Sequence, residues 1–495
     1  MLFNSYIFIF VFLPATLVFV FVAHARLGKA GLFASLTIAS LVFYAWWDPR
    51  YAVLPIGSML VNYAIGRRVA PGQSARRAWL VLGLASNLGL LCWFKYAAFF
   101  ATNVEALTGF ELSIQRTVLP LAISFITFEQ IAYLVDRYRG QIGPHGFLLY
   151  SAFLTYFPHL IAGPIVRFEE IADQLTVQAP AAQRWDDAAA GTAIFVIGLF
   201  KKVVIADNLA PHADSIFALA ESGAPITLFA AWAGALAYTF QLYFDFSGYS
   251  EMALGLSLLF GVRLPINFLS PYKARSIIEF WRRWHVSLSR FLRDYLYIPL
   301  GGNRRGTTRR YGNLMLTMTL AGLWHGAGWT FVIWGAIHGA MLVVNHGWRA
   351  LAGRLGRAAS HGTVRGGILT FLCVVLAWVV FRAETVGGAS HLLAAMAGKH
   401  GIVLPTTPAA IAPWLAPLPT VVLPALAVSA VIVFLLPNVP QLFAEHLKLP
   451  REAADALRPR LVWRFDLLHG AMLGLLAFWS LASLARPQQF LYFNF

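Results

Sequence analysis

One histidine stands inside a stretch apolar enough to lie within a membrane. His325 follows Trp324 in LAGLWHGAGWTFVIWGAIHG, residues 320–339. An ionisable side chain is costly at membrane depth, so it usually faces a protein-lined or hydrated cavity and marks a functional position. The glycines around it remove side-chain bulk, which lets a backbone or ligand approach the imidazole. His325 is therefore the first candidate for chemistry, and a core histidine bonded to a carbonyl is the alternative.

Other kinds of site lack their signatures. The chain has no GxxxxGK[ST] or GxSxG motif, and no HExxH spacing that would predict a metal site. Cys92 and Cys373 lie in apolar runs without CxxC spacing, which argues against disulfides and zinc. Histidine chemistry without a metal remains. A neutral imidazole can take a proton from an attacking hydroxyl group near neutral pH.

A second histidine lies in the densest basic segment, EFWRRWHVSLSRFLRDYLYIPLGGNRRG, residues 279–306. Apolar residues recur at three- and four-residue intervals and predict one amphipathic helix that starts near Ser276 and lies in the membrane interface. His285 would sit beside its apolar face, which is formed by Trp281, Trp284, Leu288 and Phe291.

The arginines of this segment have two explanations. They can retain the loop in the cytoplasm and anchor the helix at the membrane surface. Alternatively, Arg282, Arg283 and others attract the phosphates of an anionic donor such as coenzyme A, for which guanidinium groups are multidentate donors. The sequence leaves both explanations of the arginines open. Asn303 follows this helix in a predicted turn.

The elements that position these residues are membrane spans. The chain is 59% hydrophobic and only 12% charged, which excludes a soluble enzyme. Its net charge of +16 is placed in loops, as cytoplasmic retention and anionic headgroups require, so nucleic acid is not an expected partner but membrane lipids are. The apolar runs predict spans at 5–24, 30–47, 50–66, 78–98, 118–136, 147–163, 190–206, 226–260 (broken or doubled), 312–345 (a pair), 366–382, 420–437 and 465–484.

The basic loops predict orientation and three interrupted segments. Cytoplasmic placement of those loops leaves both termini outside. The run 312–345 is short for two crossings, so we expect a short or re-entrant hairpin with His325 near its bend. Residues 157–171 contain two prolines, and residues 241–255 carry Asp245 within an apolar run. These interruptions predict a cavity within one membrane domain, residues 1–495.

Five motifs together resemble the membrane-bound O-acyltransferase (MBOAT) superfamily. They are WRRWHVSLSRFLRDYLYIPLGGNR, LWHGAGWTFVIWG, FDFSGYSEMALG, FPHLIAGPIVRF and SLVFYAWWDPRY. The likeness is to its bacterial branch that acylates alginate, peptidoglycan and teichoic acid. It covers residues 1–385 well and 386–495, which hold the C-terminal helices and tail, less well.

The resemblance implies an all-α polytopic membrane protein: a ring of about eleven transmembrane helices, with re-entrant and interfacial helices, around a central tunnel. It implies an O-acyltransferase with acetyl-coenzyme A as donor and no permanently bound cofactor. The family histidines fall on His325, as catalytic base or acyl relay, and on His285. Residues of the donor approach would be Trp284, Arg282, Arg283, Asn303, Trp324 and Asp245.

The family likeness extends to the aromatic tail FLYFNF, residues 490–495. In related systems such a tail is thought to carry the acyl group on its tyrosine, which here is Tyr492. Anchoring at the headgroup level is the alternative.

The function expected is O-acetylation of an exported or cell-wall polysaccharide, across the bacterial inner membrane, completed by an extracytoplasmic SGNH-like partner. Lipid acylation and glycan-precursor transport are the alternatives.

Overall fold

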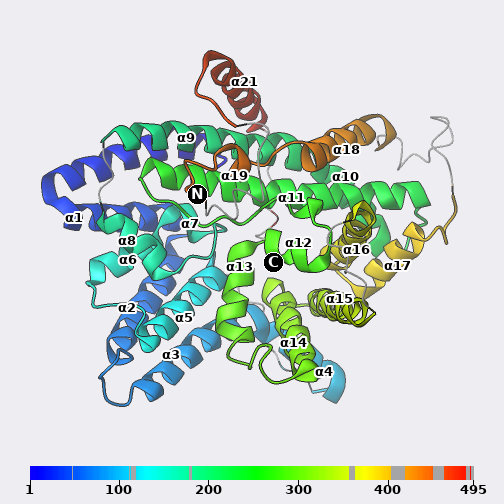
Figure 1. Ribbon diagram of the computed structural model, residues 1–495, viewed down its shortest axis with the longest axis horizontal. Helices are drawn as coiled ribbons and strands as arrows, with labels where there is room; N and C mark the ends of the chain where they lie inside the picture. The colour runs from blue at the N-terminus through cyan, green and yellow to red at the C-terminus, as the bar shows by residue number, and fades with distance from the viewer. Residues whose placement is uncertain are drawn as a thin grey trace. The chain divides into compact units, whose positions relative to one another are not determined.

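All the regular secondary structure in the residues that the structure describes is helical. The structure is a computed structural model, and it describes residues 1–46, 48–110, 112, 119–177, 181–355, 363–402, 418–449, 462–485 and 491. The α-helices are α1 Leu13–Ala45, α2 Val53–Arg68, α3 Arg76–Leu91, α4 Ala97–Thr108, α5 Ile123–Arg139, α6 Phe147–Thr155, α7 Phe157–Leu160, α8 Phe168–Thr176, α9 Ala181–Phe200, α10 Asp207–Glu221, α11 Leu228–Leu259, α12 Ile277–Arg283, α13 Val286–Leu292, α14 Thr307–His325, α15 Trp329–Arg354, α16 Val364–Arg382, α17 Val386–Met396, α18 Leu418–Leu435, α19 Val439–Leu442 and α21 Leu467–Ser483 (Figure 1).

Several of these helices are long and apolar enough to cross a membrane. Such stretches among the described residues are Phe8–Ala45, Arg76–Thr108, Gln183–Glu221 and Val364–Arg382. The prediction of an all-α polytopic membrane protein is confirmed. The chain divides into two compact units, Met1–Val196 with Tyr249–Ile266, and Ile197–Gly248 with Asn267–Phe495. The single-domain assignment stays a prediction.

The first unit contains two breaks that the sequence predicted. Helix α1 bends at Gly28, whose φ of 62° lies in the left-handed region, between the two predicted spans. Helix α6 ends at the non-helical Tyr156, and within the segment 157–171 the short α7 stops at Leu160, before α8 begins at Phe168. The freed N–H of Phe157 donates to the hydroxyl of Ser40 over 3.0 Å, so a neighbouring helix satisfies the broken backbone.

A buried polar pair holds this broken segment. His159 of α7 lies 3.0 Å from the carboxylate of Glu129 on α5, and both side chains are almost fully buried. The other ring nitrogen of His159 donates to the carbonyl of Phe153, over 3.1 Å. Buried polar groups need such partners. Sequence reasoning quoted the motif that contains His159 but did not single out this histidine.

Two predictions about the continuity of helices are wrong. The run 241–255 was expected to interrupt a span, but it lies within the continuous helix α11. The helix stays unbroken because neighbouring side chains pair with its polar groups, as described below for Asp245. The single amphipathic helix starting near Ser276 is also wrong. Ser276 does cap a helix, since its hydroxyl accepts the N–H of Glu279, but the chain breaks at His285 into α12 and α13.

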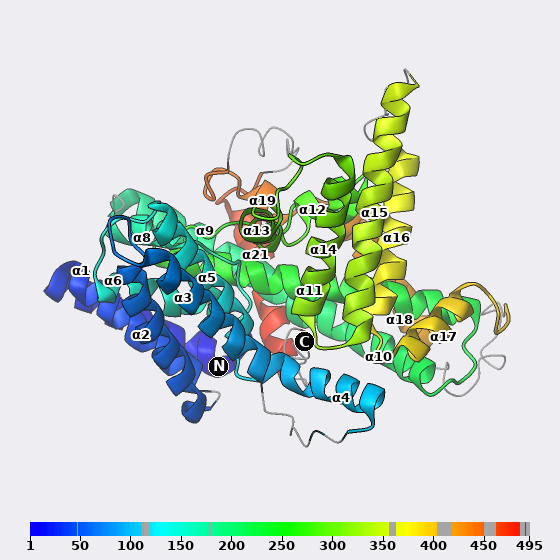
Figure 2. The ribbon, with the colours of Figure 1, turned by 90° about the horizontal axis from the view of Figure 1, so that it is seen from below.

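The second unit also holds the expected hairpin. Helices α14 and α15 run side by side, joined by only a few residues, and α16 runs along α15 (Figure 2). The bend falls directly after His325, where the sequence placed it.

Candidate active site

His325 ends α14 and is enclosed by aromatic rings. Its ring centroid lies 4.9 Å from that of Trp324 and 5.4 Å from that of Trp334 on α15. Phe381 of α16 approaches to 5.3 Å. The side chain is only 7% exposed. Three helices of the second unit therefore fix this imidazole in a nearly dry setting, where hydrogen bonds and charges act more strongly than in water.

Close contact between α14 and α15 places His325 beside these rings. A Cβ atom on Gly322 would collide with the carbonyl oxygen of Phe331. One on Gly335 would collide with the carbonyl oxygen of Met318. Both obstacles are backbone atoms, which cannot move aside as a flexible side chain does. The glycines of this hairpin thus permit backbone contact, as small residues do between membrane helices.

His285 lies at the break between α12 and α13. Its backbone adopts φ 42° and ψ 56°, a left-handed conformation that is uncommon for any residue with a side chain. The break is held by Asn267: its carbonyl accepts the N–H of Val286 over 3.0 Å, and its side chain accepts the hydroxyl of Ser287 over 2.6 Å. These two hydrogen bonds hold the start of α13 at the break, where the periodicity predicted a continuous helix.

The two predicted histidines meet at one indole. The ring of His285 is 1% exposed and lies 4.8 Å from Phe246 and 6.4 Å from Trp324, edge-on to both. Trp324 in turn contacts His325. Within the described part of the chain, neither ring nitrogen of His285 hydrogen-bonds to another residue. A buried imidazole without such a partner is costly and is typical of a site that receives a ligand.

A third histidine joins this region, and the sequence analysis did not assign it a role. His338 of α15 is fully buried, and its Nδ1 accepts a hydrogen bond of 3.2 Å from the indole N–H of Trp281. The neutral ring therefore carries its proton on Nε2. Its signal was the spacing from His325 to His338 in one apolar run. These two positions are thirteen residues apart, which does not match the HExxH spacing of a metal site.

The predicted donor-approach residues differ in their surroundings. Trp284 is buried and stacks on Phe280 and Tyr272. Arg283 is tied to Glu279 over 2.6 Å, whereas Arg282 is exposed. Asn303 is also exposed, in the turn after the Gly301–Gly302 pair. Trp284 and Trp324 thus belong to the buried region, while Arg282 and Asn303 lie at the surface of the second unit.

Among the described residues, no three His, Cys, Asp or Glu side chains gather as a metal ion would require. The buried region therefore offers bases and aromatic surfaces in place of a ligand set. Such a region can accept a proton and exclude water from an acyl transfer.

Comparison with known proteins identifies the family. The model of the MBOAT, membrane-bound O-acyltransferase family matches residues 79–378. The chain is 43% identical over 442 residues to the peptidoglycan O-acetyltransferase of Helicobacter pylori, which covers 82% of this chain and 81% of the relative. It is 46% identical over 406 residues to the probable alginate O-acetylase AlgI of Pseudomonas aeruginosa, covering 80% and 75%.

The chain belongs to the membrane-bound O-acyltransferase family. It is therefore an acyltransferase and a multi-pass membrane protein. A more distant relative is the teichoic acid D-alanyltransferase of Streptococcus thermophilus, 29% identical over 281 residues, 53% of this chain and 68% of that protein.

Asp245 of this acyltransferase forms a buried ion pair that sequence reasoning missed. Lys202 places its ammonium group 2.6 Å from the carboxylate of Asp245 and 2.6 Å from that of Asp207. Lys202 and Asp245 are each about 1% exposed. Lys202 lies in a π-helical turn, Lys201–Ala206, a local distortion that is frequent at functional sites. The pairing could not be found in the sequence because the partners lie on different helices.

One described residue of the C-terminal tail, Leu491, lies beside this ion pair of the acyltransferase. Tyr492 lies outside the described residues, but the preceding Leu491 is described and buried, at 2% exposure. The backbone N–H of Leu491 lies close enough to the Asp245 carboxylate to interact with it. Leu491 also belongs to the aromatic core cluster that contains Trp284 and Trp334.

A basic cluster lies on the same unit of the acyltransferase. Arg310 of α14 donates to Nδ1 of His346 on α15, over 2.9 Å. The charges of Arg282 and Arg349 also lie close enough to act on His346. Arginines from three helices thus lie near one imidazole. Like charges gathered in this way repel one another unless an anion joins them.

Proposed function

We propose that this acyltransferase moves an acetyl group from acetyl-coenzyme A, across the bacterial inner membrane, for O-acetylation of an exported or cell-wall polysaccharide. The observation that carries the proposal is the meeting of two buried histidines, His325 and His285, at Trp324. The names of relatives more than 40% identical support the acceptor class, because they describe acetylation of peptidoglycan and alginate.

In the proposed reaction His325 is the base. Its neutral imidazole accepts the proton of the attacking hydroxyl group as the oxygen bonds to the acetyl carbonyl carbon. The carbon–sulfur bond of the thioester then breaks, and the coenzyme A thiolate takes this proton from the imidazolium and leaves as the thiol. His285 lines the approach and is placed to hydrogen-bond a bound group. General-base assistance of this kind contributes about 10²–10⁴-fold to a rate.

The basic cluster supports an anionic donor. Arg282, Arg310 and Arg349 offer guanidinium groups around His346, and phosphates are the groups that such forks bind best. We assign them to the phosphates of coenzyme A. Arg310→Gln is then expected to raise the KM for acetyl-coenzyme A while leaving kcat within about twofold, as loss of uniform binding does.

The attacking hydroxyl in this proposal is the phenol of Tyr492. The Tyr492 O–H bond breaks, and the phenol oxygen gains the acetyl group. An extracytoplasmic SGNH-like partner later transfers the acetyl group to a hydroxyl group of the polysaccharide, and the tyrosine oxygen takes up the proton of that hydroxyl group. Support comes from Leu491, the residue before the tyrosine, which is buried in the aromatic core of the second unit and lies beside Asp245. Both termini would face outward, and a ring of about eleven helices around a tunnel would connect the two compartments.

The test compares His325→Ala with His212→Ala in cells that lack the native copy. His212 is a partly exposed histidine on α10 that the proposal does not use. We expect His325→Ala to abolish alkali-labile acetate on exported glycan at normal protein level, and His212→Ala to retain it.

Two results would contradict the proposal. Labelled acetate that appears on lipids and not on glycan would favour lipid acylation. Export of glycan precursor that continues in the His325→Ala variant, with no dependence on acetyl-coenzyme A, would favour transport. Intact-mass spectrometry that finds no acetyl adduct on Tyr492, with full activity of Tyr492→Phe, would remove the carrier step alone.

A further inference from the structure

The first unit contains a cavity that the acyl-transfer proposal does not use. Its volume is about 460 Å³, within the range of small-molecule sites. Most of its wall is apolar, contributed by the first limb of α1, by α8 and by the end of α11. The lining includes Leu17, Val20, Leu175, Leu259 and Phe260. The walls fit a hydrocarbon chain.

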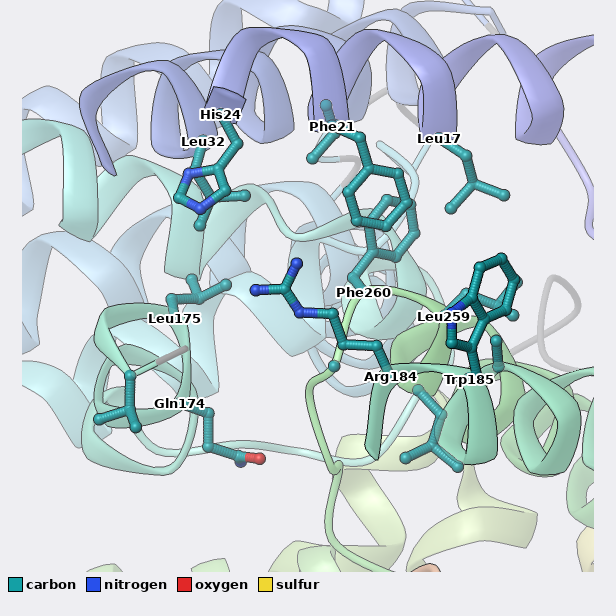
Figure 3. A pocket seen from close by; sticks show the side chains of 15 residues that line it. Leu17, Phe21, His24, Leu32, Gln174, Leu175, Arg184, Trp185, Leu259 and Phe260 are labelled. Atoms are coloured by element: carbon teal, nitrogen blue, oxygen red, sulfur yellow. The ribbon is translucent and has the colours of Figure 1, made fainter. Parts of the chain in front are cut away.

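The same cavity has a cationic end. Arg184 of α9 extends its guanidinium group into the space between the helices, toward the side where His24 of α1 lies (Figure 3). His24 is oriented by its Nδ1, 3.1 Å from the carbonyl of Gly28. None of the described residues that line the cavity is acidic. The polar end thus favours a negative group.

Two features put the cationic end at the depth of lipid headgroups. Arg184 and Trp185 are the second and third residues of the candidate span Gln183–Glu221, and Trp185 is 79% exposed. Tryptophan and arginine collect at this level of a membrane. His24 lies one turn before the bend of α1 at Gly28, which separates the two predicted spans.

The outer face beside the cavity is suited to acyl chains. Val18, Phe19 and Val22 are all exposed on the same limb of α1, within the candidate span Phe8–Ala45. An apolar exposed face of this kind marks contact with the membrane in a multi-pass protein. A lipid could therefore enter from the side.

We propose that this cavity binds one anionic phospholipid, with its phosphate at Arg184 and His24 and one acyl chain between α1, α8 and α11. Charge complementarity selects the headgroup, and the apolar wall selects an amphiphile over a free anion. Neither His285 nor His325, the histidines of the proposed acyl transfer, lines this cavity.

The test measures lipid retention by native mass spectrometry, after purification from nanodiscs of equal phosphatidylglycerol and phosphatidylcholine. The wild-type protein is expected to retain phosphatidylglycerol over phosphatidylcholine by roughly fivefold, as one cation near an anionic headgroup contributes. Arg184→Gln should remove this preference and Arg184→Lys should keep most of it. Ala188→Trp, which fills the cavity from α9, should lower retention of both lipids.

A matched control is Arg77→Gln. Arg77 is exposed and is the second residue of another candidate span, Arg76–Thr108, but does not line the cavity. The Arg77→Gln protein should retain both lipids in the same ratio as the wild type does. Equal retention by wild type and Arg184→Gln would overturn the proposal, as would an equal loss with Arg77→Gln. Inorganic phosphate that raises the unfolding midpoint as much as phosphatidylglycerol would show a free-anion site instead.

Discussion

The imidazole of His285 stands edge-on to the indole of Trp324, with 6.4 Å between ring centroids. The same indole contacts His325 at 4.9 Å. Trp324 thus contacts both predicted site histidines, although it directly precedes only one of them in the chain. We infer that its ring sets the separation of the two imidazoles, between which the thioester and the hydroxyl group of the proposed reaction would lie.

Substitution of Trp324 tests this role. Trp324→Phe keeps an aromatic face and should retain activity within about threefold, whereas Trp324→Ala should lower kcat by about tenfold or more, or about 1.4 kcal/mol in activation free energy. The measurement is acetyl transfer by purified protein at matched folded fraction. Equal activity of the two variants would mean that the indole only fills space.

The left-handed backbone of His285 predicts that some substitutions at this position keep the stability of the protein and lose only its activity. Glycine and asparagine accept φ 42°, so His285→Gly and His285→Asn should keep a wild-type unfolding midpoint. His285→Val combines β-branching with this conformation and should lose about 1–2 kcal/mol of stability. Activity should fall in all three variants, because none has an imidazole. Full activity of the stable His285→Asn protein would remove this residue from the site.

The buried ion pair predicts an asymmetry between single and double variants. Lys202→Met leaves the carboxylates of Asp245 and Asp207 without their shared cation, and removing one partner of a buried pair costs about 3–5 kcal/mol. Lys202→Met combined with Asp245→Asn should recover part of that loss, because fewer buried charges remain. Thermal unfolding in detergent measures both.

An exposed pair provides the control for this experiment. Arg293 pairs with Asp294 over 2.6 Å, but its side chain is 60% exposed. Arg293→Gln should leave the unfolding midpoint unchanged, since exposed pairs contribute little. A double variant no more stable than Lys202→Met would show that Asp245 is not stabilised through Lys202.

The sequence predicted those features of the site that depend on neighbouring residues, and it did not predict those that depend on contacts between distant parts of the chain. The length of the apolar run between two basic loops predicted the hairpin bend at His325, because this signal is local in the sequence. The break at His285 was not predicted, since it depends on Asn267, which lies outside the helical periodicity that was read. The polar residues around Asp245 suggested an interruption, but Lys202 on another helix compensates them and α11 continues. Contacts between helices therefore decided each error.

The close approach of α14 and α15 predicts that a substitution which separates these helices lowers activity. A methyl group on Gly335 would meet the backbone of Met318 and Thr319, so Gly335→Ala must push the two helices apart by several tenths of an ångström. Since His325 ends α14, we expect this shift to lower kcat by at least about tenfold, as misplacement of a catalytic group does. Gly347→Ala is the matched control on the same helix, because a Cβ there meets no atom within 4 Å. It should retain full activity and be slightly more stable, as alanine favours helix over glycine. Equal activity of the two variants would show that the spacing of the hairpin does not position His325.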